Sequence, residues 1–349
     1  MKIFKEKKVF NKKIIMSFLL IITLCSINVF SKEVDKTGTT AGKFLSIGVG
    51  PRAIGMGGAY TSLSNDASAM YWNPAGLSFL QRNEAMFSSN QLFADIKLTY
   101  FGVAIPAGDI GTFGASVTAL TMGDMFVTTE NYPEGTGETF SANSYAFGLS
   151  FAKKITEDFS VGMNIKYVTE NIYNSSANGF AFDIGTIFHT PFWGINFSSN
   201  IANYGSKLQM SGEDLLTRHD PDPTRAGNNA TVDVNYATDE FELPLRLQIG
   251  ISKEISLFDD HKLTIAVDAA HPNDNSQYVN LGGELSLFND LFCLRGGYKQ
   301  LFMKDNQEGL TLGVGVHYSL NFIAVGFDYA YQQYKYLGNT HSFGVNIKF

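Results

Sequence analysis

The sequence of 349 residues contains little cysteine, little proline and little charge. Only 17% of its residues are charged, whereas soluble globular domains usually have ~25%. Of the two cysteines, Cys25 lies in an expected signal segment, so Cys293 alone would stay in the exported chain and no disulfide framework can form. The formal net charge of −7 offers no basic surface for a nucleic-acid partner.

Catalytic and metal-binding motifs are also missing. There is no His-Glu-x-x-His spacing and no Gly-x-Ser-x-Gly elbow, so we expect no enzyme activity, no metal and no cofactor. The histidines are expected in turns or on an inner face; they are His189, His219, His261, His271, His317 and His341.

The chain has one strongly apolar run, and it lies near the N-terminus at residues 14–24. This run is shorter than the ~20 apolar residues that a spanning helix needs. It follows a lysine-rich start, and Val29 and Ser31 provide small residues before a cut at Lys32. This order predicts a cleaved secretory signal over residues 1–31. An exported chain without a later spanning helix is either a soluble protein or a β-barrel.

From residue 85 onward, apolar residues recur at every second position, which indicates strands with two different faces. A transmembrane barrel turns the apolar face to lipid, and a soluble sandwich turns it inward. We predict fourteen strands, at residues 85–90, 96–105, 111–120, 143–152, 160–169, 179–188, 194–203, 243–252, 262–270, 278–287, 292–299, 309–318, 322–331 and 341–349.

The number and spacing of these strands favour the barrel. Fourteen is even, and most segments approach the ~9–11 residues of a tilted membrane strand. Connections after even-numbered strands are short, whereas two after odd-numbered strands are long, at residues 121–142 and 204–242. Short periplasmic turns and longer external loops are typical of outer-membrane barrels. We therefore expect an all-β, fourteen-stranded antiparallel transmembrane barrel over residues 85–349, preceded by an N-terminal segment over residues 32–84.

The last strand carries a more specific feature. Its apolar face consists of Phe343, Val345, Ile347 and the terminal Phe349. A terminal aromatic residue on an alternating strand resembles the signal by which outer-membrane barrels are recognised for assembly. It implies the barrel assembly machinery and outer-membrane lipid as partners, and the bacterial outer membrane as the location.

The other face of the strands is predicted to line the lumen. It carries many glycines, which leave room for an inserted segment, and charges of both signs, which can pair across the interior. The charged lumen residues on which we rely are Arg246, Asp268, Glu284, Arg295 and Asp328.

The segment over residues 44–77 shows no strand alternation and is rich in turn signals. Gly55, Gly57 and Gly58 permit tight turns and close backbone contact. Asp66 or its neighbour can cap a helical turn, and a proline ends that turn at Asn73. These features predict a compact plug and not a disordered tail.

The run "GVGPRAIGMGGAY…NDASAMYWNPAGL" resembles the N-terminal region of the PorV/PorQ family, within the FadL-like superfamily of outer-membrane barrels. The resemblance implies that this segment folds back as a hatch inside the barrel. Its motif residues would then shape the hatch and not contact a ligand directly; they are Arg52, Gly55, Gly57, Gly58, Asp66, Trp72, Asn73, Pro74 and Ala75.

Two functions follow from the resemblance. PorV-type proteins are accessory or cargo-shuttle components of type IX secretion, which implies a secretion translocon and cargo proteins as partners. FadL-type relatives are channels for the uptake of hydrophobic small molecules, which implies an apolar ligand. The long connections at residues 121–142 and 204–242 are the surfaces most open to an external partner. Carboxylates in the second connection leave calcium as a further alternative: Glu213, Asp214, Asp220, Asp222, Asp233, Asp239, Glu240 and Glu242.

Overall fold

The computed structural model describes residues 36–222, 224, 231–258, 260–320 and 322–349. All of the described residues belong to one compact unit, Lys36–Phe349. The predicted signal peptide, residues 1–31, lies outside the described residues. No helix in the described part of the chain is long and apolar enough to cross a membrane.

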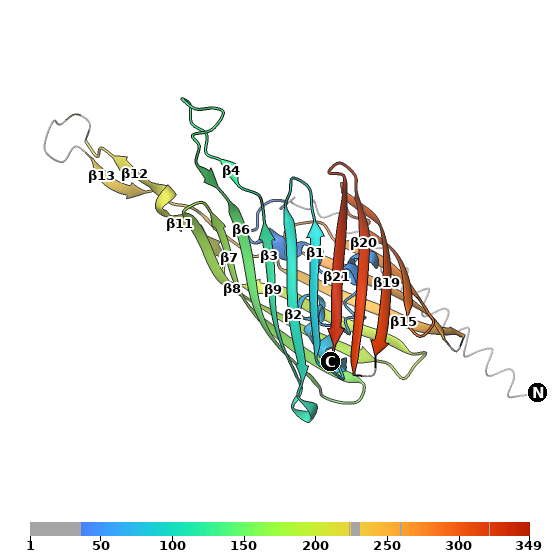
Figure 1. Ribbon diagram of the computed structural model, residues 1–349. Coiled ribbons are helices and arrows are strands. Elements are labelled where there is room, and N and C mark those ends of the chain that lie inside the picture. The colour runs from blue at the N-terminus through green and yellow to red at the C-terminus, as the bar shows by residue number, and fades with distance from the viewer. Residues whose placement is uncertain (1–35, 223, 225–230, 259, 321) are drawn as a thin grey trace, which may run out of the picture. The chain divides into compact units, whose positions relative to one another are not determined.

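Fourteen long antiparallel strands form a sheet that closes on itself (Figure 1). The first and last strands pair directly, with Glu84 opposite Lys348, and this pairing closes the barrel. The strands are β1 (Glu84–Gln91), β2 (Lys97–Pro106), β3 (Thr112–Thr121), β6 (Ala142–Lys154), β7 (Phe159–Ile172), β8 (Ser175–His189), β9 (Ile195–Gly205), β15 (Arg246–Phe258), β16 (His261–Pro272), β17 (Tyr278–Leu287), β18 (Phe292–Leu301), β19 (Glu308–Leu320), β20 (Ile323–Tyr334) and β21 (Asn339–Lys348).

The predicted fourteen-stranded barrel is therefore confirmed. The bounds of several strands differ by a few residues, and the largest difference is at β15. The prediction placed a strand at residues 243–252, whereas β15 begins at Arg246 and continues to Phe258. Pro244 has no backbone N–H to donate to a ladder, so regular pairing starts after it. Leu243, expected on the lipid face, is instead only 2% exposed and packs in the core of the N-terminal segment.

The two faces of the wall differ as a transmembrane barrel requires. On β15, Ile249 is 52% exposed on the outside, while the neighbouring Gln248 is 1% exposed on the inside. On β20, Phe327 is 60% exposed and Asp328 only 6%. Apolar side chains thus point outward and polar side chains inward, which is the arrangement of a lipid-embedded barrel and the reverse of a soluble sandwich.

This assignment of faces predicts different effects for neighbouring substitutions. Val325→Arg would place a charge in the lipid-facing row near one end of β20, where the cost is below the ~2–4 kcal/mol of the bilayer midplane. Ala324→Arg lies on the other face and should hinder assembly less. Folding of both variants into lipid vesicles measures the difference, and equal folding yields would contradict the assignment.

The connections at the two ends of the barrel differ in length. The C-terminus and the short turns lie at one end, and long hairpins project from the other end (Figure 1). The short turns include η3 (Gly108–Ile110). The connections at this end contain β4 (Met125–Phe126), β5 (Thr139–Phe140), β10 (Leu208–Gln209), β11 (Ser211–Gly212), η4 (Glu213–Leu215), β12 (Leu216–His219), β13 (Val232–Asn235) and β14 (Glu240–Phe241).

The residues before β1 form a compact hatch, residues 36–83, whose helical elements are η1 (Lys43–Ser46), α2 (Pro51–Gly55), α3 (Ala69–Trp72) and η2 (Pro74–Phe79). Proline stands at the first position of α2 and η2, where its missing N–H has no cost. As predicted, α3 ends before Asn73, which is extended at φ −163°. Its N-cap position is Ser68, whose side chain makes no capping hydrogen bond, and not Asp66 or Asn65 as predicted. Asp66 lies two residues earlier and accepts the Ser68 N–H at 2.9 Å.

An apolar core joins the hatch to the inner wall of the barrel. Trp72 and Phe44 from the hatch are 2% and 3% exposed, and they belong to one cluster with Leu98 and Tyr100 of β2. Burying a large side chain of this kind stabilises a fold by ~1.5–3 kcal/mol. The hatch is therefore an integral part of the barrel interior.

Candidate functional site

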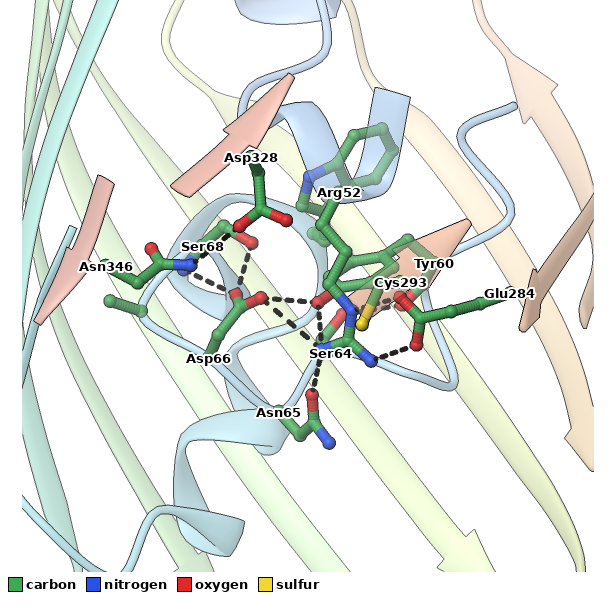
Figure 2. Close-up of polar contacts among 12 residues, drawn as sticks. Arg52, Tyr60, Ser64, Asn65, Asp66, Ser68, Glu284, Cys293, Asp328 and Asn346 are labelled. Atoms are coloured by element: carbon green, nitrogen blue, oxygen red, sulfur yellow. Dashed lines mark hydrogen bonds and ion pairs between the residues drawn. The ribbon is translucent and has the colours of Figure 1, made fainter. Parts of the chain in front are cut away.

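The hatch is tied to the barrel wall by Arg52 of α2. Its Nε donates to Glu284 Oε2 at 2.9 Å and its Nη2 to Glu284 Oε1 at 2.8 Å, a two-pronged ion pair with β17. Its Nη1 donates within the hatch to Asn65 Oδ1 at 2.7 Å and Tyr60 Oη at 3.1 Å (Figure 2). Burial alone would lower the pKa of Arg52, but the attraction of Glu284 outweighs it and raises the pKa, so the guanidinium stays charged.

The pair continues along the inner wall as a chain of alternating charges. Arg295 of β18 donates to Glu284 Oε2 at 2.6 Å and to Asp328 Oδ1 of β20 at 2.5 Å. Asp328 also contacts Nε2 of His317 at 3.1 Å and accepts from Asn346 at 3.4 Å. Three of the expected lumen charges, Glu284, Arg295 and Asp328, thus lie together with a partner of opposite charge beside each, which is how buried charges are tolerated.

Asp66 organises the loop that follows α2. Its Oδ2 accepts from Tyr60 Oη at 2.5 Å, and Arg52 lies 3.8 Å away as an ion-pair partner. Its Oδ1 accepts from both the N–H and the hydroxyl of Ser68. Burial raises the pKa of Tyr60, so the phenol stays protonated and can donate to the carboxylate.

A second anchor joins the hatch to β15 and β16. Asp268 Oδ2 accepts from the N–H groups of Tyr60 at 2.9 Å and Thr61 at 2.8 Å. The guanidinium of Arg246 lies over the rings of Tyr71 at 5.7 Å and Trp72 at 5.9 Å. All five charged lumen residues expected from the sequence therefore touch the hatch or one another.

Glycines of the wall allow the backbone of the hatch to approach closely. A Cβ atom at Gly185 would lie 1.9 Å from Asn73 Oδ1, and one at Gly162 would lie 2.3 Å from both the Ala75 nitrogen and the Pro74 carbonyl carbon. Asn73 donates to the Thr186 carbonyl at 3.2 Å and accepts from the Ala75 N–H at 3.1 Å. The Asn73-Pro74-Ala75 turn is thus held against β7 and β8.

The glycines of the hatch motif meet the opposite part of the wall. Gly57 and Gly58 adopt positive φ angles of 66° and 74°, which favour glycine. A Cβ atom on Gly57 would lie 2.7 Å from the Leu281 carbonyl oxygen, and one on Gly55 would lie 3.1 Å from the Cα of Gly313. The expected room in the lumen is filled by these close contacts.

The predicted assembly signal lies apart from the hatch. Phe343, Ile347 and Phe349 are exposed on the outer face of the barrel, and Val345 is half-buried in the same row. The Phe349 N–H donates to the Asn83 carbonyl at 2.9 Å, immediately beside the first strand. These residues and the hatch network therefore form two separate groups.

Several contacts with the hatch were not foreseen from the sequence. Asn164 donates to the Met70 carbonyl at 3.0 Å, and Asn200 donates to the Trp72 carbonyl at 2.9 Å. Tyr60, which bonds Arg52, was not singled out either. Both asparagines stand on the inward positions of their strands, so the alternation could have marked them as lumen residues.

The acidic connection before β15 gives no support for a metal site. In the parts of the chain that the structure describes, no three His, Cys, Asp or Glu side chains form a group that could hold a metal ion. One exposed pair, Arg218 with Asp233 at 3.5 Å, joins β12 to β13.

The chain is similar to one known protein family. The family model described as type IX secretion system protein PorV matches residues 30–270, from before the hatch into β16. No curated protein sequence matches the chain.

Several solved structures share the fold. The CymD monoaromatic hydrocarbon channel is 14% identical, with a TM-score of 0.55, over 86% of this chain and 97% of that chain. The Pseudomonas putida toluene transporter TodX is 13% identical, with a TM-score of 0.55, over 86% of this chain and 98% of that chain. A FadL homologue of Pseudomonas aeruginosa is 12% identical, with a TM-score of 0.51, over 84% and 96%. Such low identities establish a common fold and leave the function to other arguments.

Proposed function

Because the chain belongs to the PorV family of type IX secretion system proteins, we propose that it serves in the outer membrane as an accessory or cargo-shuttle component of that system. The family match, which covers the hatch and more than half of the barrel, carries the proposal. The partners would be the secretion translocon and secreted cargo proteins.

The projecting hairpins are the surfaces proposed to meet these partners. Residues 122–141 contain four carboxylates and no lysine or arginine. Their exposed apolar side chains include Phe126, 66% exposed, and Tyr132, 63% exposed. The β12–β13 hairpin is also acidic and exposes Leu216 at 55%. A partner face with basic residues around an apolar centre would match this surface, and its association would weaken as salt screens the charges.

Replacement of residues 125–140 by a short Gly/Ser linker should reduce capture of the partners. The loop lies outside the wall, so the barrel should still assemble. The measurement is a pull-down of the tagged protein from outer membranes in mild detergent, with mass spectrometry of all retained proteins. We expect the unaltered chain to retain a large translocon subunit or secreted proteins, and the variant to retain at least ~10-fold less, about 1.4 kcal/mol of binding.

A matched control replaces the tight external turn at residues 335–338 with the same linker and should leave capture unchanged. Equal retention by both variants would remove the hairpin from the proposed interface. Recovery of the barrel without any secretion protein would count against the secretion function itself.

One observation favours the second candidate, a FadL-type channel for hydrophobic small molecules. The fold is shared with solved structures described as a monoaromatic hydrocarbon channel and a toluene transporter. An apolar groove lined by Phe87, Val314, Phe327 and Phe343 lies on the outer, lipid-facing side of the wall and adds no support for a path through the lumen. Recovery of a bound apolar molecule from the purified barrel, without secretion proteins, would favour this function.

A further inference from the structure

An apolar groove lies on the outer side of the wall formed by β1, β19, β20 and β21, which stand next to one another in Figure 1. Its lining is mainly apolar and includes Phe87, Val314, Val316, Phe327, Phe343 and Val345. Phe87 is 48% exposed and Phe327 is 60% exposed, and both stand on the outward positions of their strands. The groove therefore opens to the hydrocarbon of the membrane, where an acyl chain can fill it.

A row of polar side chains crosses the same wall beside one end of the groove. In the strand register, Gln91 of β1 stands opposite Lys97 of β2 on one side and opposite His341 of β21 on the other. His341 in turn stands opposite Tyr331 of β20. All four occupy outward positions of their strands. Because Gln91 ends β1 and Lys97 begins β2, the row lies at the end of the barrel from which the hairpins project.

Two aromatic residues connect this polar row to the groove. Tyr329 and Phe343 both line the groove, and their ring centroids lie 5.2 Å apart. Tyr329 Oη forms a hydrogen bond with His341 Nδ1 at 2.7 Å, and the ring of Tyr331 lies edge-on to His341 at 5.8 Å. The outward row of β21 thus changes from apolar Val345 and Phe343 to polar His341. Such a change marks the boundary between the hydrocarbon and the headgroups of the membrane.

The polar row offers hydrogen-bond donors and one positive charge. Lys97 is exposed, and a lysine at this level extends its ammonium group to the headgroups while its stem stays in the apolar layer. A neutral imidazole that accepts a hydrogen bond at Nδ1 carries its hydrogen on Nε2, so His341 can donate there. The side-chain amide of Gln91, which stands between the two, also donates. Three donors next to a groove for an acyl chain match a lipid with a phosphate in its headgroup.

The corresponding outward positions of β7 and β8 have different chemistry. Tyr167 Oη donates to Asn178 Oδ1 at 3.1 Å, so these two polar groups bind each other. Closer to the hairpins, the outward residues of β7 are Thr169 and Asn171, which carry no charge. A lysine beside a groove therefore distinguishes the β2–β1–β21–β20 wall from the aromatic boundary at β7 and β8.

We propose that the β2–β1–β21–β20 wall binds one anionic lipid of the external leaflet, with its phosphate at Lys97, Gln91 and His341 and an acyl chain in the groove. The groove is continuous with the lipid-facing surface, so the lipid enters from the membrane without passing the hatch. The polar row contains no residue of the hatch network, and the site does not depend on the function proposed above.

Native mass spectrometry of the detergent-purified protein, with dioleoyl phosphatidic acid or dioleoyl phosphatidylcholine added, tests the site. The two lipids have the same acyl chains, but phosphatidic acid alone has a net negative charge. The unaltered chain should retain phosphatidic acid in preference to phosphatidylcholine. Lys97→Gln should reduce the retention of phosphatidic acid about fivefold, the usual effect of one basic residue near a lipid surface, and leave that of phosphatidylcholine unchanged.

Val345→Trp fills the groove and should reduce the retention of both lipids. Heat-dependent electrophoretic mobility reports whether each variant has folded. Loss of binding in Lys97→Gln without any loss in a folded Val345→Trp would place the lipid outside the groove and contradict the proposal. Lys97→Gln decides the matter if Val345→Trp does not fold.

The matched control is Lys253→Gln, which removes the same charge from an exposed outward position of β15, outside the groove. This variant should retain phosphatidic acid like the unaltered chain. Equal retention of the two lipids by the unaltered chain, or an equal loss in Lys97→Gln and Lys253→Gln, would overturn the site. Capture of a second copy of the chain without lipid would likewise overturn it and make the wall a protein interface.

Discussion

Arg52→Ala is expected to destabilise the folded barrel by ~3–5 kcal/mol, the usual effect of removing one partner from a buried ion pair. Both prongs of the guanidinium bind Glu284, which is only 3% exposed on β17. Without Arg52, Arg295 is the one cation that still donates to Glu284. Tyr60 and Asn65 lose their hydrogen bonds to the Arg52 guanidinium, which connects them to the wall. The hatch should loosen before the strands separate.

Unfolding by guanidinium chloride in detergent measures this effect. Of the two tryptophans, Trp72 is 2% exposed in the hatch and Trp193 is 82% exposed, so the change in fluorescence on unfolding comes mainly from Trp72 and reports the hatch. The control is Arg218→Ala, which breaks the exposed Arg218–Asp233 pair on β12 and β13. Exposed pairs contribute ~0–1 kcal/mol, so the control should unfold almost like the unaltered chain. Equal midpoints for the two variants would show that Arg52 does not hold the hatch.

Local pattern was enough to predict the barrel and its faces. Alternation has a period of two, so each strand identifies its own inward and outward residues without knowledge of its neighbours. The predicted alternation accordingly agrees with the outward position of Ile249 and the inward position of Gln248. Where a local rule competes with the pattern, the prediction was wrong: Pro244 ends the ladder, and Leu243 turns into the hatch core.

The interior contacts could not be predicted in the same way. Arg52 and Glu284 are 232 residues apart, and their meeting depends on the closed register of fourteen strands together with the path of the hatch. Composition predicted paired charges in the lumen, but not which carboxylate would bind which guanidinium. The same limit applies to Gly185, whose closeness to Asn73 follows from three-dimensional packing.

Gly297→Ala is expected to destabilise the protein by ~1–3 kcal/mol or more, because the added methyl group overpacks a rigid contact. The new Cβ would lie 2.3 Å from the Gly57 nitrogen and 2.5 Å from the Met56 carbonyl carbon, both of which are backbone atoms. Gly57 already has a φ angle of +66°, so its backbone can shift little to relieve the contact. The hatch must move away from β18, and limited proteolysis should then cut it faster.

The neighbouring Gly296→Ala provides the control, because no atom lies within 4 Å of its added Cβ. Both glycines belong to β18 and neither has a positive φ, so the loss of backbone freedom in the unfolded chain is the same. Gly296→Ala should therefore change stability by no more than ~0.5 kcal/mol and leave the hatch protected. The difference in stability between the two variants measures the contact between the hatch backbone and Gly297. Both variants could instead unfold at the same guanidinium chloride concentration, with the hatch cut equally slowly. In that case Gly297 does not pack against the hatch, and the close packing inferred for the lumen is wrong.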